Sequence, residues 1–318
     1  MKILITGAAG FIGSHLLEEL VKQKHDVIGV DNYDEFLYPS DYKRKNLQEV
    51  EQNVGKKVEI IPFDINSSKI VDLLKSENPD VIVHLAARAG VRASLKDPLS
   101  YSEFNIRGTI NLLEAARQAG VEHFVFGSSS SVYGKTDRIP FVEDDYADKP
   151  LSVYAASKRS GELMCYAYHN IYGLSVNCLR FFTVYGPRQR PDMAIHKFTR
   201  MIESGEQITI FGDGTSKRDY TYCKDIVQGI IGAINYRRGF EVFNLGNSQV
   251  VELNYLISLI EKETGKKAIT KRVPWPKTDP LVTSADITKA KKMLGYSPKT
   301  NIEEGIHNFV EWYKMRRV

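Results

Sequence analysis

The stretch Gly7-Ala8-Ala9-Gly10-Phe11-Ile12-Gly13 follows a short apolar run, Ile3 to Ile5, and leads directly into a segment with helical periodicity, Ser14 to Lys24. This order predicts a strand, a glycine turn and a helix. Glycine lets the backbone approach a pyrophosphate, and the free N–H groups at the start of the helix favour its negative charge. We therefore expect a dinucleotide at this turn, in contact with Gly7, Gly10, Phe11, Ile12 and Gly13.

An acidic residue ends the second apolar run. Asp31 stands 18 residues after Gly13, where a carboxylate can accept hydrogen bonds from both hydroxyls of an adenosine ribose. The same charge repels a 2′-phosphate, so this position favours NAD over NADP. Asn32 adjoins it, and Asp64 with Ile65 follows the third apolar run, where an acid can receive the adenine amino group. The structural alternative for both acids is a cap or turn residue.

Apolar runs alternate with helical segments through the first 180 residues, and a strand that is apolar on both faces needs cover on both sides. The runs are Ile3 to Ile5, Val27 to Val30, Val58 to Ile61, Val81 to Leu85, Phe124 to Phe126 and Val176 to Leu179. This pattern predicts an α/β protein with a doubly wound parallel (Rossmann) sheet over residues 1–180. A smaller α/β lobe that binds the substrate is expected over residues 181–318, with some exchange of chain between the two.

Composition excludes several classes of protein. The 318 residues are 42% hydrophobic and carry a net charge of +4, with basic and acidic residues interleaved, so nucleic-acid binding is not indicated. We find no secretory signal and no apolar stretch long enough for a membrane span, which makes the cytoplasm the expected location. The three cysteines and seven histidines show no metal-ligand spacing, so we expect reduced thiols and no metal.

Further motifs complete a pattern that runs along nearly the whole chain. They are His84-Leu85-Ala86-Ala87, Asn105, Ser128 to Gly134, Tyr154-Ala155-Ala156-Ser157-Lys158 and Arg218-Asp219-Tyr220. With the glycine stretch and Asp31, they closely resemble the nucleotide-sugar epimerase/dehydratase branch of the extended short-chain dehydrogenase/reductase superfamily. The resemblance implies that Leu85, Ala86, Ala87 and Asn105 line the cofactor, together with Tyr154 and Lys158. It also implies that Ser129, Tyr154 and Lys158 form the catalytic set.

Tyr154 and Lys158 stand four residues apart in a helical segment, which places both side chains on one face. A free tyrosine, with a pKa of about 10, is a poor base at neutral pH, so we expect the charges of Lys158 and of oxidised nicotinamide to lower its pKa. The mechanism implied by the resemblance has Tyr154 remove the proton of the sugar 4-hydroxyl, with Ser129 as relay, while the C4 hydride passes to NAD. The 4-keto sugar then rotates and takes the hydride back on its other face, so tightly bound NAD is regenerated in each turnover.

Within that branch, the segments at residues 128–134 and 180–194 are most similar to UDP-glucuronate 4-epimerases. A uronic acid oxidised at C4 is a β-keto acid that loses carbon dioxide when the carboxylate bond aligns with the carbonyl. Side chains that hold the carboxylate out of that alignment are expected at Ser130, Ser131, Thr183 and Arg190. Related dehydratases and decarboxylases carry acids where Ser130 and Ser131 stand. Ordinary polar loop residues are the alternative for these positions.

The nucleotide is expected to contact Arg218, which resembles an arginine that grips the diphosphate, with Tyr220 beside it and Asp279 as a ribose-binding acid. Relatives commonly place an arginine three residues before that acid. This chain has Pro276 there and Lys277 next to it, so Lys277 is a candidate replacement, and Asp279 is open to a second interpretation as a turn residue.

Several activities remain open from the sequence. The rivals to a UDP-glucuronate 4-epimerase are a UDP-glucose or UDP-N-acetylhexosamine(uronate) 4-epimerase, then a UDP-glucuronate decarboxylase and a non-catalytic NAD-binding regulatory protein. Thr283, whose bulk bears on N-acetyl acceptance by resemblance, excludes none of them. A homodimer is also expected by resemblance, through the helix that carries Tyr154, with Leu163, Tyr166 and Tyr168 as candidate contacts.

Overall fold

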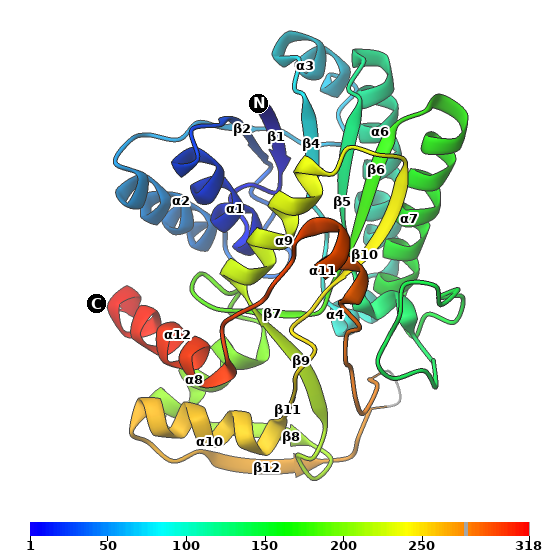
Figure 1. Ribbon diagram of the computed structural model, residues 1–318. Helices are drawn as coiled ribbons and strands as arrows, with labels where there is room; N and C mark the ends of the chain where they lie inside the picture. The colour runs from blue at the N-terminus through cyan, green and yellow to red at the C-terminus, as the bar shows by residue number, and fades with distance from the viewer. Residues whose placement is uncertain (277–278, 318) are drawn as a thin grey trace.

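The computed structural model describes residues 1–276 and 279–317. In this part of the chain, seven parallel strands form a central sheet in the order β10-β6-β5-β4-β1-β2-β3 (Figure 1). The strands are β1 (Lys2–Thr6), β2 (Asp26–Asp31), β3 (Ile60–Pro62), β4 (Val81–His84), β5 (His123–Ser129), β6 (Ser175–Phe181) and β10 (Phe240–Leu245). The strand order reverses between β1 and β4, and ligands of such sheets bind outside the carboxyl ends of the strands at this point.

Helices cover both faces of the sheet, which confirms the doubly wound prediction. One face carries α1 (Phe11–Lys22), α2 (Ser40–Val54) and α9 (Cys223–Asn235), and the other carries α3 (Ile70–Glu77), α6 (Gly108–Ala119) and α7 (Val153–Tyr172) (Figure 1). Because alternate strand residues point to opposite faces, Ile3 and Ile5 enter one apolar cluster and Leu4 enters the other. All three are fully buried.

Short helical turns connect the sheet to the site. After β4 come α4 (Val91–Lys96), α5 (Pro98–Tyr101) and a π-helical turn, η1 (Ser102–Arg107), which continues into α6. A 3-10 turn, η2 (Ser130–Tyr133), follows β5 directly. Both connections leave the carboxyl ends of central strands, so their residues face the same edge of the sheet.

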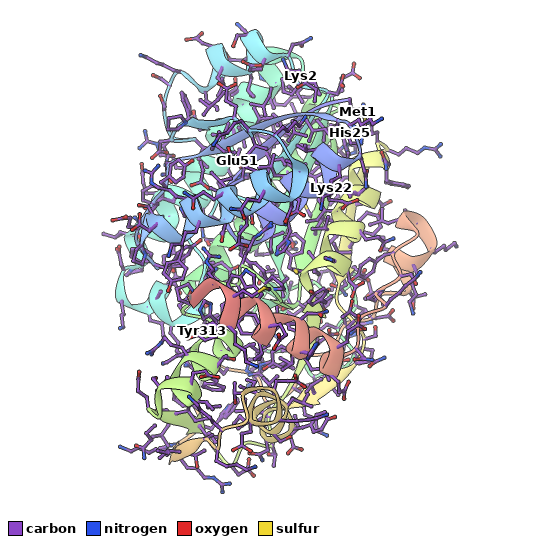
Figure 2. All side chains as sticks on the ribbon, turned by 90° about the vertical axis from the view of Figure 1, so that its left-hand side faces the viewer. Met1, Lys2, Lys22, His25, Glu51 and Tyr313 are labelled. Carbon is purple, nitrogen blue, oxygen red and sulfur yellow. The ribbon has the colours of Figure 1, made fainter. Side chains whose placement is uncertain are left out.

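The second lobe is built on smaller sheets, within the residues that the structure describes. In one of them β9 (Lys217–Tyr222) lies between β7 (Thr183–Tyr185) and β11 (Val250–Glu252), and in the other β8 (Gln207–Phe211) pairs with β12 (Ile269–Val273). The helices of this part are α8 (Ala194–Ser204), α10 (Leu253–Thr264) and α12 (Ile302–Arg317), whereas α11 (Thr288–Leu294) packs on β10 and α9 of the first lobe. Figure 2 shows α12, which carries Tyr313, below the helices α1 and α2, which carry Lys22 and Glu51.

Some of the chain beyond residue 180, the expected domain boundary, belongs to the first lobe. Residues 223–235 return as α9 to cover the sheet beside α1, and residues 240–245 return as β10 to pair with β6. The return covers the outer edge of β6 and buries Phe243 and Leu245 completely. The first helix also begins earlier than expected, at Phe11 instead of Ser14.

The three cysteines are free and buried, at Cys165, Cys178 and Cys223. Among the described residues, no helix is both long enough and apolar enough to span a bilayer. The same residues contain no group of three histidine, cysteine or acidic side chains placed to hold a metal ion.

Candidate active site

A cavity of about 400 Å³ opens at the carboxyl ends of the central strands. It brings together most of the side chains that the sequence singled out. Its lining includes Gly7, Gly10, Phe11, Ile12, Gly13, Asp31, Asn32, Asp64, Ile65, Leu85, Ala86, Ala87, Ser129, Ser130, Ser131, Tyr154, Lys158, Thr183 and Arg190. The expected cofactor residue Asn105 and the expected nucleotide residues Arg218, Tyr220 and Asp279 lie outside this lining.

The glycine turn between β1 and α1 is packed so tightly that side chains cannot replace Gly7 and Gly13. A Cβ on Gly13 would stand 2.1 Å from the carbonyl oxygen of Gly7. Gly7 has a φ of +73°, and a Cβ there would stand 2.8 Å from the backbone nitrogen of Ala86. The turn thus presents bare backbone at the start of α1, and this geometry fits a pyrophosphate.

Asp31 lies at the end of β2 and is 5% exposed. Its carboxylate accepts hydrogen bonds from the backbone N–H groups of Ala9 (3.1 Å) and Tyr33 (2.8 Å). Lys43 of α2 donates to the same carboxylate at 3.2 Å. Spacing found the acid, but it could not find Lys43, because the lysine reaches Asp31 from a helix whose position is set by tertiary packing.

Asn105 does not line the cavity, in contrast to the expectation from resemblance. Its side-chain amide accepts a hydrogen bond from the backbone N–H of Arg88 and donates one to the Arg88 carbonyl, each at 2.8 Å. It also donates to the Ser157 hydroxyl at 2.9 Å. Asn105 is 2% exposed. It therefore sits behind the lining, where it joins the loop after β4 to the residue before Lys158.

Arg88 is a lining residue that the sequence reasoning missed. Its guanidinium lies between the rings of Phe36 and Phe104, 4.1 Å from the centre of each, and pairs with Asp34 at 2.9 Å. A lone arginine beside an alanine-rich motif gives no signal in the sequence, since its two aromatic partners lie in separate segments, a loop and the helical turn η1. Tyr38 also lines the cavity, and burial raises the pKa of its hydroxyl to about 12.

Tyr154 and Lys158 project from the first turns of α7, whose N-terminus is capped by the Ser152 hydroxyl. The Lys158 ammonium is buried and donates to the carbonyl oxygen of Gly127 at 2.7 Å. Burial lowers the pKa of Lys158 to about 8. The amine is thus poised to gain or lose its charge near neutral pH.

The Tyr154 hydroxyl is hydrogen-bonded with the Ser129 side chain. Burial raises the pKa of Tyr154. The hydrogen bond with Ser129 and the charge of Arg190 lower this pKa, but by less than burial raises it, so it stays above its usual value. This corrects the expectation that Lys158 lowers the pKa of Tyr154, because the ammonium is directed at a carbonyl instead. Within the described chain, Arg190 is the cation that favours the phenolate.

The serine turn after β5 lies beside Tyr154. The Ser129 hydroxyl accepts from the backbone N–H of Ser131 at 3.2 Å and donates to the Ser131 hydroxyl at 3.1 Å. Ser130 and Thr183 are partly buried in the same lining. The turn therefore offers several hydroxyl groups to one small region of the cavity.

Arg190 faces the same region, and its side chain is 19% exposed. Its guanidinium is paired within the chain. Its Nε and Nη2 atoms donate to the two oxygens of Asp192, at 2.9 and 2.8 Å. Two of its five donors are thus occupied, and the remaining three are available to an anion.

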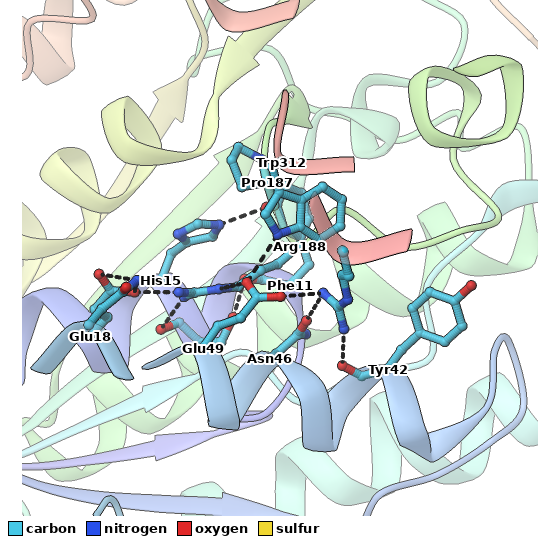
Figure 3. A network of polar contacts seen from close by, with 12 residues as sticks. Phe11, His15, Glu18, Tyr42, Asn46, Glu49, Pro187, Arg188 and Trp312 are labelled. Carbon is cyan, nitrogen blue, oxygen red and sulfur yellow. Dashed lines mark hydrogen bonds and ion pairs between the residues drawn. The ribbon is translucent and has the colours of Figure 1, made fainter. Parts of the chain in front are cut away.

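A buried ion network holds the segment that carries Arg190 (Figure 3). Arg188 has a left-handed backbone, with φ of +61°, and its side chain is 3% exposed. It pairs with Glu18 of α1 and, at 3.1 Å, with Glu49 of α2. His15 bonds the carbonyl of Pro187 at 2.8 Å, and burial lowers the pKa of this histidine to about 3. The segment is thereby fixed to the helix that follows the glycine turn.

The C-terminal helix joins the same network through Glu49 (Figure 3). The Trp312 indole donates to Glu49 at 3.0 Å, and Arg316 pairs with it at 3.2 Å. Arg316 also donates to Asn46 and to the carbonyl of Tyr42. These partners are more than 260 residues apart, so the sequence alone gave no sign of them.

The expected nucleotide residues lie on the second lobe. Arg218 donates to the carbonyls of Lys217 and Leu281, at 2.9 and 3.1 Å. Tyr220 is 5% exposed and packs edge-on against Tyr185, so it belongs to the core of this lobe. Asp279 pairs with Arg92 at 3.0 Å. The candidate Lys277 lies outside the described residues.

The cavity and the sheet above it define a dinucleotide-dependent enzyme of the Rossmann class. The chain belongs to the NAD dependent epimerase/dehydratase family, whose profile matches residues 3–246. A UDP-glucuronate 4-epimerase of Thermodesulfobacterium geofontis is 43% identical over 98% of this chain and 95% of that protein. The UDP-glucuronic acid 4-epimerase of Bacillus cereus, solved with UDP-glucuronic acid and NAD, superposes with a TM-score of 0.92 at 39% identity, over 99% of this chain and all of that one. The UDP-glucose 4-epimerase of Thermotoga maritima gives 0.90 at 33% identity over the whole of both chains.

Proposed function

We propose that this protein is a UDP-glucuronate 4-epimerase, which interconverts UDP-glucuronate and UDP-galacturonate through a transient 4-keto sugar. The observation that carries the proposal is that Tyr154 and Arg190 share one cavity with the hydroxyl-rich turn at residues 129–131. The tyrosine supplies acid–base chemistry, and the guanidinium matches a uronate carboxylate. Relatives of that name at 40–43% identity over 98% of the chain support this choice.

NAD is the cofactor of this family, and the glycine turn with Asp31 fits it. When bound, NAD takes up the C4 hydride and adds a positive charge to the cavity. The chain supplies the proton chemistry: the Tyr154 phenolate accepts the proton of the 4-hydroxyl and the resulting phenol returns it, with Ser129 holding the phenol oxygen in place. The raised pKa of Tyr154 keeps the phenol protonated until a cation approaches. Among the described residues that cation is Arg190. Lys158, whose ammonium is bonded to the Gly127 carbonyl, is charged below about pH 8 and adds to the positive charge of the cavity.

The carboxylate of the substrate is assigned to Ser130, Ser131, Thr183 and Arg190. Hydroxyl donors and the free N–H groups of Arg190 hold it away from the alignment in which a 4-keto acid loses carbon dioxide. Acids at the two serine positions would repel the carboxylate. Hydroxyls at these positions therefore support an epimerase over a decarboxylase.

One observation favours a second candidate, a UDP-glucose 4-epimerase. The bidentate pair with Asp192 neutralises much of the charge that Arg190 would offer to a uronate. A panel of UDP-sugars incubated with the purified protein and followed by NMR separates the two. UDP-galacturonate as the main product supports the proposal, and turnover of UDP-glucose with little turnover of UDP-glucuronate contradicts it.

We further propose a cytoplasmic homodimer that pairs through α7. Leu163 and Tyr166 are about half exposed on this helix, at 51% and 52%, and can contribute apolar area to a contact between two copies of α7. Free cysteines fit a reducing compartment. Sedimentation of the wild type and of Leu163→Glu tests the pairing, because a charge there should yield monomers if α7 is the interface.

A further inference from the structure

We propose that Arg92, which belongs to the cofactor lobe, binds the diphosphate of the nucleotide from the side opposite Arg218. This inference rests on the proposed function and adds to it a substrate-binding residue. Arg92 is the second residue of α4, directly after the loop at residues 85–91 that lines the cavity. The position is therefore next to the site but on the other lobe from the expected nucleotide residues.

The Arg92 side chain leaves its own lobe and ends on the second one. Its Nη2 atom lies 3.0 Å from a carboxylate oxygen of Asp279, and its guanidinium lies 4.1 Å from the centre of the Phe211 ring. Phe211 ends β8, and Asp279 follows β12. Arg92 thus bridges the two lobes at the place where the nucleotide is expected.

Among the described residues, the Arg218 guanidinium lies near the charges of both Arg92 and Asp279. Burial lowers the pKa of Arg218, and the nearby charge of Arg92 lowers it further, whereas Tyr220 and Asp279 oppose the shift. Within the part of the chain that the structure describes, the guanidinium groups of Arg92 and Arg218 therefore lie near the Asp279 carboxylate. A diphosphate carries the negative charge that would balance them, and planar guanidinium forks bind phosphate oxygens well.

Residues 274–278, directly before Asp279, include no arginine. Pro276 stands three residues before Asp279, and proline has no charge or N–H to offer. Arg92 brings a guanidinium to the same carboxylate from the opposite lobe. Because a guanidinium carries five N–H donors, Arg92 can keep its bond with Asp279 and bind a phosphate oxygen at the same time.

Calorimetric titration of the NAD-loaded protein with UDP, UMP and uridine tests this role. The Arg92 side chain is 55% exposed, so Arg92→Met is expected to fold normally. UDP should bind this variant about 10- to 150-fold more weakly, the fold-change that corresponds to a charge-assisted hydrogen bond. Uridine should change less than about twofold. The matched control is Arg107→Met, a 65% exposed arginine of the same lobe, which should bind UDP as the wild type does.

Three outcomes would overturn the inference. The first is unchanged UDP affinity in Arg92→Met, and the second is an equal loss for UDP and uridine, which would assign Arg92 to the nucleoside. The third is wild-type UDP affinity in the double variant Arg92→Met/Asp279→Asn, which would mean that Arg92 only neutralises the acid. A wild type that binds no UDP would instead overturn the proposed function, and this inference with it.

Discussion

Replacing Arg190 with alanine removes the guanidinium that faces the hydroxyl-rich turn. A hydrogen bond to a charged group is worth about 1.5–3 kcal/mol, so its loss should lower kcat/KM for UDP-glucuronate about 10- to 150-fold. The low exposure of Arg190, 19%, limits screening by water and favours the upper part of this range. The change also leaves Asp192 unpaired near the substrate carboxylate, which adds repulsion. UDP-glucose has no carboxylate, so any side activity on it should fall much less.

NMR of the products measures both the rate and the fate of the intermediate. A less restrained 4-keto acid can rotate into the decarboxylating alignment, so Arg190→Ala should also release UDP-pentose. The double variant Arg190→Ala/Asp192→Asn should recover the part of the loss that is due to repulsion, and Arg200→Ala, a half-exposed arginine of α8, serves as the control. If Arg190→Ala folds, binds NAD and epimerises UDP-glucuronate at the wild-type rate, the carboxylate assignment is wrong.

Four other changes test separate parts of the site. Tyr154→Phe removes only the proton-carrying oxygen, so it should abolish turnover by NMR while the NAD content stays unchanged. Asp31→Ala removes the ribose acceptor and leaves Lys43 unpaired, so titration should show weaker NAD binding and a smaller preference over NADP. The pKa of Lys158 is lowered to about 8, so its charge is present below that pH, and kcat should fall as the pH rises through it. Glu49→Gln removes a carboxylate shared by two arginines and a tryptophan, and should cost about 1–3 kcal/mol of stability in urea unfolding.

Each of these has a clear opposing result. Near-wild-type turnover of Tyr154→Phe would refute the acid–base role. Unchanged affinity and preference in Asp31→Ala would refute the ribose contact. A flat pH profile of kcat between 7 and 9 would show that catalysis does not depend on the charge of Lys158. If Glu49→Gln unfolds at the wild-type urea concentration, the network of Figure 3 contributes little to stability.

The parts of the fold that could be predicted are those that depend on residues close together in the sequence. The glycine turn needs Gly7 and Gly13 because a Cβ at either would strike backbone, and such a requirement is visible in a single stretch. Asp31 was found by its distance along the chain from that turn. The alternation of apolar runs and helices gave the parallel sheet, because strands and helices each bury a periodic face.

The parts that could not be predicted depend on contacts between distant segments. Nothing near residue 240 indicates that β10 completes the sheet, since its partner β6 lies some 60 residues earlier. Arg188 reads as an ordinary loop arginine until Glu18 and Glu49 are brought to it. Asn105 was matched to the cofactor by motif, but the packing of α7 turns its amide to Ser157. In each case tertiary packing decides which distant segment or side chain becomes the partner.

In the proposed mechanism, one hydride leaves C4 of the sugar and returns to the same carbon. UDP-glucuronate carrying deuterium at C4 tests it most directly, with the wild-type protein in ordinary water and NMR of the UDP-galacturonate formed. The product is expected to keep its deuterium at C4, because the label never reaches the solvent. UDP-galacturonate that carries hydrogen at C4, or a wild type that leaves UDP-glucuronate unchanged, would contradict it.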